Sequence, residues 1–433
     1  MNKKALFVLI VTLIGCRSQM IQETEKLTEI YESDSTVEAY NKIEYNLNTI
    51  RLHKVNDELS LPIINLNSNE KLELSFDDLS NDLSTFYVTI DHYDSDGKKS
   101  NLLKSEFVDG FIKDEIIDYE FSFNTLKNYI HYKYIFPSEN LKPLISGNYK
   151  LKVFDLNGDT IITKQFMIIE NMININMNIK KATLSADRKT KHEIDFSINH
   201  PNFNIPDPFS QIKIVIKQNN KDDNAIRDLL PMYIRNNTLI YDYNEENTFY
   251  GNNEFRHFDI KSLRYFSDRV KNITKDSINY EVFLYPDFKK TFNNYSIEPD
   301  LNGNFYIKSQ EARNSDIESE YVNVNFELNS DFITNGDIYI IGDLNNWKIN
   351  ENYKLEYNFQ KNKYEAKVEL KQGYYNYHYA INDTSLNYLD VSSIEGTHYQ
   401  TRNKYQIYVY YKSLNERFER LIGFAEELSK ELF

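Results

Sequence analysis

Apolar and polar residues alternate with a period of two in many short segments along most of the chain. This alternation is typical of β-strands that bury one face, because successive side chains of a strand point to opposite sides of the sheet. Clear examples are Leu72, Leu74 and Phe76; Ile130, Tyr132, Tyr134 and Phe136; Tyr149, Leu151 and Val153; Ile212, Ile214 and Ile216; Val322, Val324 and Phe326; and Tyr405, Ile407 and Val409. Their recurrence at short spacing predicts an all-β protein built from stacked β-sandwiches.

Turn residues divide this pattern into domains. Asn or Asp stands directly before Gly at Asp96-Gly97, at Asn157-Gly158 and at Asn302-Gly303, as tight hairpin turns require. We expect an N-terminal β-sandwich over residues 36–169, a middle β domain over 170–318 and a C-terminal sandwich over 319–433. A short closing helix is expected where apolar residues recur at helical spacing: Leu414, Phe418, Leu421, Ile422 and Leu428.

The N-terminus matches a bacterial lipoprotein signal. Two lysines precede an apolar run that ends at Ile14, and Gly15 stands directly before Cys16. The run is shorter than the ~20 residues of a transmembrane helix and is typical of a processed export signal. We therefore expect residues 1–15 to be removed, Cys16 to carry lipid and residues 16–35 to form a tether. No acidic run follows Cys16 directly, so the periplasmic face of the outer membrane is the expected location.

The net charge restricts the partners of the chain. It is −15 at pH 7, and loss of the two lysines within residues 1–15 makes it more negative still. Phosphate backbones and anionic headgroups would repel such a chain, so nucleic acid is not an expected partner. Contact with the membrane is expected through the lipid alone.

Motifs for catalysis and metal binding are missing from the sequence. The eight histidines form no HExxH pair, the lone cysteine forms no CxxC site, and the glycines form no nucleotide or nucleophile motif. Asp77 and Asp78 are adjacent in an expected strand, so their carboxylates point to opposite faces and cannot share the cleft of a glycosidase. The sequence predicts no enzyme activity, no cofactor, no metal and no small-molecule substrate.

One segment suggests an alternative function. Residues 341–347, which end at Trp347, together with residues 370–377, resemble the early-set, immunoglobulin-like sandwich that carries starch- and glycogen-binding modules. A glycan-binding lipoprotein that uses the Trp347 domain is therefore the alternative hypothesis. Trp347 is the only tryptophan, whereas an aromatic sugar platform normally has more than one. The competing interpretation is a tryptophan that pins a turn against its own sheet.

Several longer strings point together to one family. They are Ser75-Phe76-Asp77-Asp78-Leu79, Ser122-Phe123-Asn124-Thr125, Tyr129-Ile130-His131-Tyr132, Ser146-Gly147-Asn148-Tyr149, residues 251–259, Ser262-Leu263-Arg264, residues 370–375, residues 394–398 and Val409-Tyr410-Tyr411. In this order, over roughly residues 40–424, they resemble the plug protein of the type IX secretion system. The strings identify the family better than they identify any contact.

The resemblance implies a component of a secretion machine and no catalysis. It implies that the chain binds the outer-membrane translocon β-barrel and seals its periplasmic end when the lateral gate of the barrel is open or is not occupied by the substrate carrier. Tyr is favoured in interface cores, so Tyr374, Tyr375 and Tyr377 are candidate docking residues. Equally, these tyrosines can pack their own sandwich. Arg256 is a further candidate contact, and the competing interpretation is a structural pair with Glu254.

Overall fold

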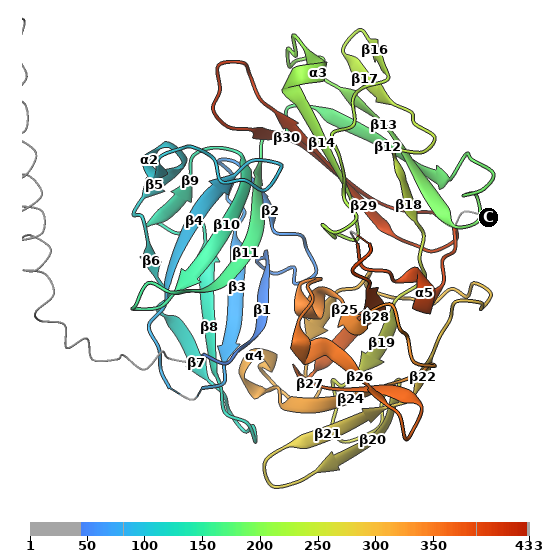
Figure 1. Ribbon diagram of the computed structural model, residues 1–433. Coiled ribbons are helices and arrows are strands. Elements are labelled where there is room, and N and C mark those ends of the chain that lie inside the picture. The colour runs from blue at the N-terminus through green and yellow to red at the C-terminus, as the bar shows by residue number, and fades with distance from the viewer. Residues whose placement is uncertain (1–44, 81, 387, 431–433) are drawn as a thin grey trace, which may run out of the picture. The chain divides into compact units, whose positions relative to one another are not determined.

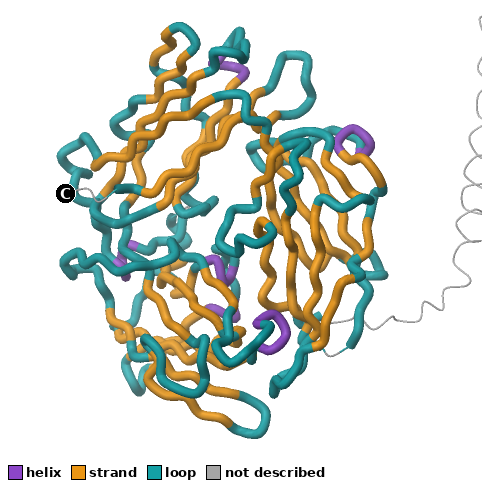
Figure 2. The backbone as a smooth tube through the Cα atoms, turned by 180° about the vertical axis from the view of Figure 1, so that it is seen from behind, coloured by secondary structure: helices purple, strands orange, loops and turns teal. Residues whose placement is uncertain are grey.

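The computed structural model describes residues 45–80, 82–386 and 388–430 of the chain. Strands dominate this part, and the helices within it are single short turns, as Figure 2 shows in orange and purple. The all-β fold predicted from the alternation is therefore confirmed. The expected export signal, the lipid site Cys16 and the tether lie outside the described residues.

The first sandwich consists of two sheets that face each other across one core (Figure 1). In hydrogen-bonded order, the strands of one sheet are β1 (Leu47–Lys54), β3 (Leu72–Asp78), β8 (Ile130–Phe136) and β7 (Asp118–Phe121). The strands of the other sheet are β2 (Ile63–Asn65), β11 (Thr160–Ile169), β10 (Gly147–Phe154), β4 (Tyr87–Tyr93) and β6 (Asp114–Glu115). The turn α2 (Lys104–Phe107) precedes a small ladder of β5 (Val108–Gly110) and β9 (Leu141–Pro143). The alternating residues of β3 and β10 face this core, because Leu74 and Leu151 are completely buried.

The second sandwich combines distant parts of the chain. The strands of one sheet are β12 (Asn174–Lys181), β13 (Lys191–Asn199), β17 (Thr238–Tyr241) and β16 (Tyr233–Arg235), and β18 (Thr248–Tyr250) also pairs with β13. The strands of the other sheet are β15 (Ile226–Arg227), β14 (Ile212–Gln218), β29 (Lys404–Tyr411) and β30 (Arg420–Leu428). The turn α3 (Pro208–Gln211) leads into β14. Figure 1 shows β29 and β30, in red, beside the green strand β14.

The closing helix expected near the C-terminus is wrong, because residues 420–428 form the strand β30. The pairing of β29 with β30 shifts by one residue at Tyr410, which pairs with Leu421, whereas Val409 pairs with Gly423. The extra residue, Ile422, makes a β-bulge, so two neighbouring apolar residues can both be buried. This bulge explains why the spacing of the apolar residues imitates a helix.

The third sandwich is a long strand series around a single core. In order, its strands are β19 (Arg256–Asp259), β28 (Gly373–Asn382), β25 (Asp337–Ile341), β26 (Lys354–Asn358), β27 (Lys363–Lys371), β24 (Tyr321–Asn329), β21 (Tyr280–Leu284) and β20 (Val270–Lys275), with β22 (Asp287–Phe288) on β24 and β23 (Phe305–Ile307) on β28. The short helical turns here are α4 (Ser315–Glu318), η1 (Asp343–Asn345), η2 (Glu351–Tyr353) and α5 (Ser392–Glu395).

The order of the strands along the chain nests this third sandwich inside the second one. The strands of the third sandwich lie between β18 and β29, which both belong to the second sandwich. Strands on the two sides of residue 318 are hydrogen-bonded, since β14 pairs with β29 and β21 pairs with β24. A cut of the chain at 318 would therefore separate partners within two sheets. No helix in the described part is long and apolar enough to cross a lipid bilayer.

Candidate functional site

A buried carboxylate joins the first sandwich to the third. One oxygen of Asp77, on β3, lies 2.6 Å from Nδ1 of His131 on β8. The other oxygen accepts a 2.6 Å hydrogen bond from the Tyr321 hydroxyl and lies 2.6 Å from the Lys371 ammonium. Tyr321 and Lys371 belong to β24 and β27 of the third sandwich. One carboxylate is thus held by side chains from both sides of the interface.

The surroundings of Asp77 determine its charge. The four side chains of this cluster are almost completely buried. Burial acts to raise the pKa of Asp77, but the Lys371 ammonium and His131 outweigh it and hold that pKa below its ordinary value. Burial lowers the pKa of Lys371, and the carboxylate of Asp77 acts against this shift. The two side chains form a buried ion pair. Removing one member of such a pair leaves an uncompensated charge inside the protein.

The turn α4 is clamped onto the same joint. The carbonyl of Asp316 accepts hydrogen bonds from the Lys371 ammonium at 2.5 Å and from the Tyr129 hydroxyl at 3.2 Å. The Asp316 carboxylate pairs with Arg51 of β1 at 3.0 Å. The Lys371 ammonium also lies 4.2 Å from the centre of the Tyr129 ring, which favours a cation in this position.

A second carboxylate extends this interface. Glu320 accepts hydrogen bonds from the backbone amides of Leu126 and Lys127 at 2.8 Å and 3.1 Å. The amide of Phe123 donates to the carbonyl of Ile317 at 2.8 Å. The loop between β7 and β8 is therefore bonded directly to the third sandwich.

A hairpin turn joins the first sandwich to the second. The turn comprises residues 94–97 and contains the pair Asp96-Gly97, at which the sequence predicts a tight turn; its Gly97 has a φ of +79°. The amide of Ser95 donates to Glu419 at 2.7 Å, and the same carboxylate lies 2.5 Å from the Lys213 ammonium. Arg227 donates to the carbonyl of Ser95 at 2.8 Å. A turn that looks generic in the sequence is thus a docking loop between domains.

The second and third sandwiches meet through closely approaching backbone. The amide of His398 donates to the carbonyl of Asn252 at 2.8 Å, and the Thr397 hydroxyl donates to the carbonyl of Thr190 at 2.9 Å. A Cβ atom on Gly251 would lie only 2.0 Å from the carbonyl oxygen of His398. Only glycine fits this crossing without a shift of the backbone.

These joints explain the strings that carry the family resemblance. Asp77 belongs to the string 75–79 and Lys371 to the string 370–375, and the strings 251–259 and 394–398 meet at Gly251 and His398. In the sequence, Asp77 is notable only as an unsuitable catalytic acid, and no motif marks Lys371. The sequence signal for this joint is a charged residue near the end of a strand whose other residues include a buried apolar row, as with Asp77 in β3 and Lys371 in β27.

The structure buries three of the four candidate docking residues. Tyr375 and Tyr377 are 2% and 1% exposed within the core of the third sandwich, and Arg256 is 6% exposed. In this conformation they cannot touch a partner. Tyr374 is half-buried and stacks against His257 and Tyr306. The interpretation in which these tyrosines pack their own sandwich therefore agrees with the geometry.

Arg256 has a structural role, but with other partners than expected. Its guanidinium lies 2.9 Å from Glu395 and 2.8 Å from Asp287, and these carboxylates raise its pKa although burial alone would lower it. Tyr377 donates to Asp287 at 2.7 Å. The expected partner Glu254 instead accepts from the Tyr295 hydroxyl at 2.5 Å, because residues 254 and 256 face different neighbours.

Trp347 is a packing residue. Its ring makes an edge contact with Phe255, with centroids 5.8 Å apart, and a Cβ on Gly303 would lie 2.3 Å from it. The amide of Trp347 donates to the carbonyl of Gly342 at 2.9 Å, which closes the turn after β25. The turn-pinning interpretation agrees with this arrangement, and a free aromatic platform for sugar does not.

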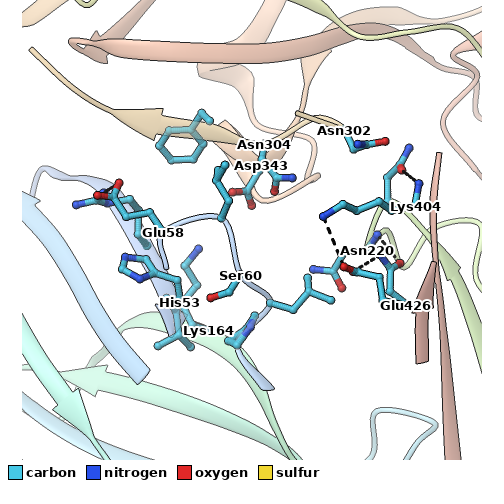
Figure 3. A pocket seen from close by; sticks show the side chains of 18 of the residues that line it. His53, Glu58, Ser60, Lys164, Asn220, Asn302, Asn304, Asp343, Lys404 and Glu426 are labelled. Atoms are coloured by element: carbon cyan, nitrogen blue, oxygen red, sulfur yellow. Dashed lines mark hydrogen bonds and ion pairs between the residues drawn. The ribbon is translucent and has the colours of Figure 1, made fainter. Parts of the chain in front are cut away.

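A small cavity lies where side chains of all three sandwiches converge (Figure 3). It encloses about 70 Å³ and adjoins a second hollow of about 250 Å³ that shares Lys164 and Asp343 with it. Burial raises the pKa of Asp343 and lowers the pKa of Lys164. Both volumes are below the ~300–1,000 Å³ of typical ligand sites, so these hollows are interstices between domains. Across residues 45–430, as far as they are described, no group of three or more His, Cys, Asp or Glu could hold a metal ion.

Comparisons with known proteins agree with this architecture. Residues 47–170, which contain the first sandwich, match the model of the type 9 secretion system plug protein first domain. The chain is also similar to a crystal structure of a hypothetical protein from Parabacteroides merdae ATCC 43184, with 32% sequence identity and a TM-score of 0.86 over 88% of this chain and 97% of that one. No curated protein matches the chain. From the matched first domain and the strings that meet at the joints, we conclude that the chain belongs to the plug protein family of the type IX (type 9) secretion system.

Proposed function

We propose that this protein is a non-enzymatic plug that binds the outer-membrane translocon β-barrel of the secretion system and seals its periplasmic end when the lateral gate is open or is not occupied by the substrate carrier. Family membership supports a role in the secretion system and a place in the cell envelope. The match covers the first domain, and the structural relative has 97% of its length in common with this chain. The partner and the sealing action are the parts that we propose.

The observation that carries the proposal is the buried ionic joint between the first and third sandwiches. A body that closes a wide pore must keep its shape under contact with the rim. The Asp77–Lys371 pair and its neighbours hold two sandwiches through buried, hydrogen-bonded charges instead of a flexible linker. Breaking such a contact is costly, so the sandwiches move together. This stiffness suits a closure and offers no reacting groups to a substrate.

We further propose that lipid on Cys16 tethers the plug to the periplasmic face of the outer membrane. Tethering raises the effective concentration of a detached plug near the pore, so modest affinity is enough for resealing. The acidic charge of the chain argues against electrostatic binding to anionic lipid, so the acyl chains would supply the attachment.

Co-purification with the translocon tests the proposal. A tagged translocon barrel is isolated in mild detergent from cells that produce the wild-type chain, and its partners are identified by mass spectrometry. We expect this chain among them. Its absence, with the other translocon components still present, would contradict the proposed function.

A second arm tests the anchor. In the Cys16→Ala variant we expect the chain to move from the membrane fraction to the soluble periplasmic fraction, while its affinity for the purified translocon stays the same. A variant that remains fully membrane-bound in cells without the translocon would exclude the proposed lipid site.

A further inference from the structure

An exposed apolar row runs along β7 of the first sandwich. Ile117, Tyr119, Phe121 and Phe123 follow one another at two-residue spacing, and each is a large side chain that is at least 40% exposed. The rings of Tyr119 and Phe121 contact each other edge to face, with centroids 6.0 Å apart. We call these four residues the β7 patch. Contiguous exposed apolar residues of this kind mark interaction sites more often than isolated ones do.

The β7 patch continues the core side of its sheet. Tyr119 lies opposite Tyr132, and Phe121 lies opposite Ile130, in the pairing of β7 with β8. Tyr132 and Ile130 are buried core residues. Side chains directly opposite each other share one face of a sheet, so the two aromatic rings face the core side. The facing sheet ends in β6, a strand of two residues, and leaves both rings partly uncovered.

Among the residues that the structure describes, no strand pairs with the outer edge of β7. β7 is the last strand of its sheet, and all four of its residues are exposed. Lysine is one of the side chains that often protect an edge strand from pairing with another chain. The edge strand β20 of the third sandwich follows this rule, because it carries the exposed residues Lys271 and Lys275. β7 carries no lysine, and its other face presents the exposed acids Asp118 and Glu120.

The edge is held in a fixed position. On one side β7 pairs with β8, and just beyond its end the amide of Phe123 is bonded to the carbonyl of Ile317 in α4. The following loop is bonded to Glu320. A preformed edge loses little conformational entropy when another strand binds to it.

We propose that β7 is the docking edge for an extended segment of the translocon. This segment pairs with the backbone of β7, covers the β7 patch with alternate apolar side chains and places Lys or Arg beside Asp118 and Glu120. Strand addition of this kind obtains affinity from main-chain hydrogen bonds and specificity from alternate side chains. The acidic face selects a basic segment and steers its approach. This inference rests on the proposed function and names the surface that performs it.

Charge substitution in the patch tests the docking edge. Phe121→Lys keeps the backbone and places a charge in the centre of the patch, and Phe292→Lys is the matched control because Phe292 is 98% exposed elsewhere. Both substitutions replace exposed rings, so both full-length proteins should keep the wild-type urea midpoint. Burying an aromatic anchor is a typical hot-spot contribution, and we expect F121K to reduce the co-purified translocon at least about tenfold. F292K should leave the yield unchanged.

Photo-crosslinking gives a second measurement without a new charge. A benzophenone amino acid at position 121 should crosslink to the translocon barrel, and the same group at position 292 should not. A crosslink from position 121 to a second copy of this chain would overturn the proposal. Equal co-purification of F121K and wild type, or equal loss in F121K and F292K, would also overturn it while leaving the plug function intact. If the wild-type chain does not co-purify with the translocon, both the docking edge and the proposed plug function are contradicted.

Discussion

The Lys371 ammonium of the third sandwich lies 2.6 Å from the carboxylate of Asp77 in the first, and each side chain is only 1% exposed. The two residues are far apart in the sequence and lie on strands of different sandwiches, β3 and β27. Their contact joins the sheets of the first and third sandwiches directly. Because the desolvated charges compensate each other only when both are present, the pair reports directly on the joint.

Removing the cation should therefore destabilise the protein strongly. We predict that Lys371→Met lowers the free energy of unfolding by about 3–5 kcal/mol, because Asp77 would remain buried without the ammonium group that compensates its charge. Urea denaturation measures the change. Lys367→Met, on the same strand, is the matched control: Lys367 pairs with Glu281 at 2.6 Å but is 54% exposed. Its loss should cost less than about 1 kcal/mol. Equal effects of the two substitutions would refute the importance of the joint.

Stability should depend on pH through Glu254. Burial raises the pKa of Glu254 to about 7 from its ordinary 4.5. Between these values the folded protein binds a proton that the unfolded chain does not, so this group stabilises the fold at low pH and loses that contribution as the pH rises through 7. Between pH 5.0 and pH 7.5, the free energy of unfolding of the wild type should fall by on the order of 2 kcal/mol relative to that of Glu254→Gln.

Urea midpoints of the two proteins at the two pH values give this difference. The comparison with E254Q is needed because burial lowers the pKa of both His92 and His192 to about 4, which acts in the opposite direction. A difference between wild type and E254Q that does not change with pH would contradict the assignment.

The close crossing at Gly251 should not accept a methyl group. We predict that Gly251→Ala costs about 1–3 kcal/mol of stability, because the new Cβ would collide with the carbonyl of His398. Gly158→Ala serves as the control, since that turn has a φ of +86° but open space around it. Its cost should stay near 1 kcal/mol. Thermal unfolding of both variants separates steric conflict from backbone strain, and a fully stable G251A would exclude the conflict.

Tyr377 should act in folding and not in docking. Tyr377→Phe removes the hydroxyl that donates to Asp287 at 2.7 Å, so we expect a loss of about 1.5–3 kcal/mol of stability. The surface is unchanged, and the folded variant should co-purify with the translocon as wild type does. Tyr233→Phe, at a side chain that is 54% exposed, should be nearly neutral. A stable Y377F that no longer binds the translocon would reverse this assignment.

Part of this molecule could be predicted from local pattern and part could not. Residues such as Leu74 and Leu151 alternate within single strands, so the all-β class follows from a few neighbouring positions. The pairing of β14 with β29 depends on contacts between remote segments, for which a single sequence carries no local signal. The bulge at Ile422 depends on the pairing of β30 with β29, so the sequence alone shows only apolar residues at a spacing that resembles a helix.

The candidate site shows the same limit. Arg256 was expected to pair with Glu254 because the two are close in sequence, whereas the fold brings Glu395 and Asp287 to it. Tyr375 and Tyr377 looked like interface residues because Tyr is common in interfaces, but their strand lies inside a core. Tyr119 and Phe121 are exposed because the facing sheet ends at β6, which the alternation in the sequence does not indicate.

The central claim is that this chain closes a pore, and the leak of the outer membrane tests it most directly. The measurement is the rate at which a hydrophilic dye too large for general porins enters cells that lack the chain, compared with the same cells supplied with the wild-type protein. The account predicts faster entry without the chain and restoration by the wild type. An entry rate that does not change when the chain is removed would contradict it.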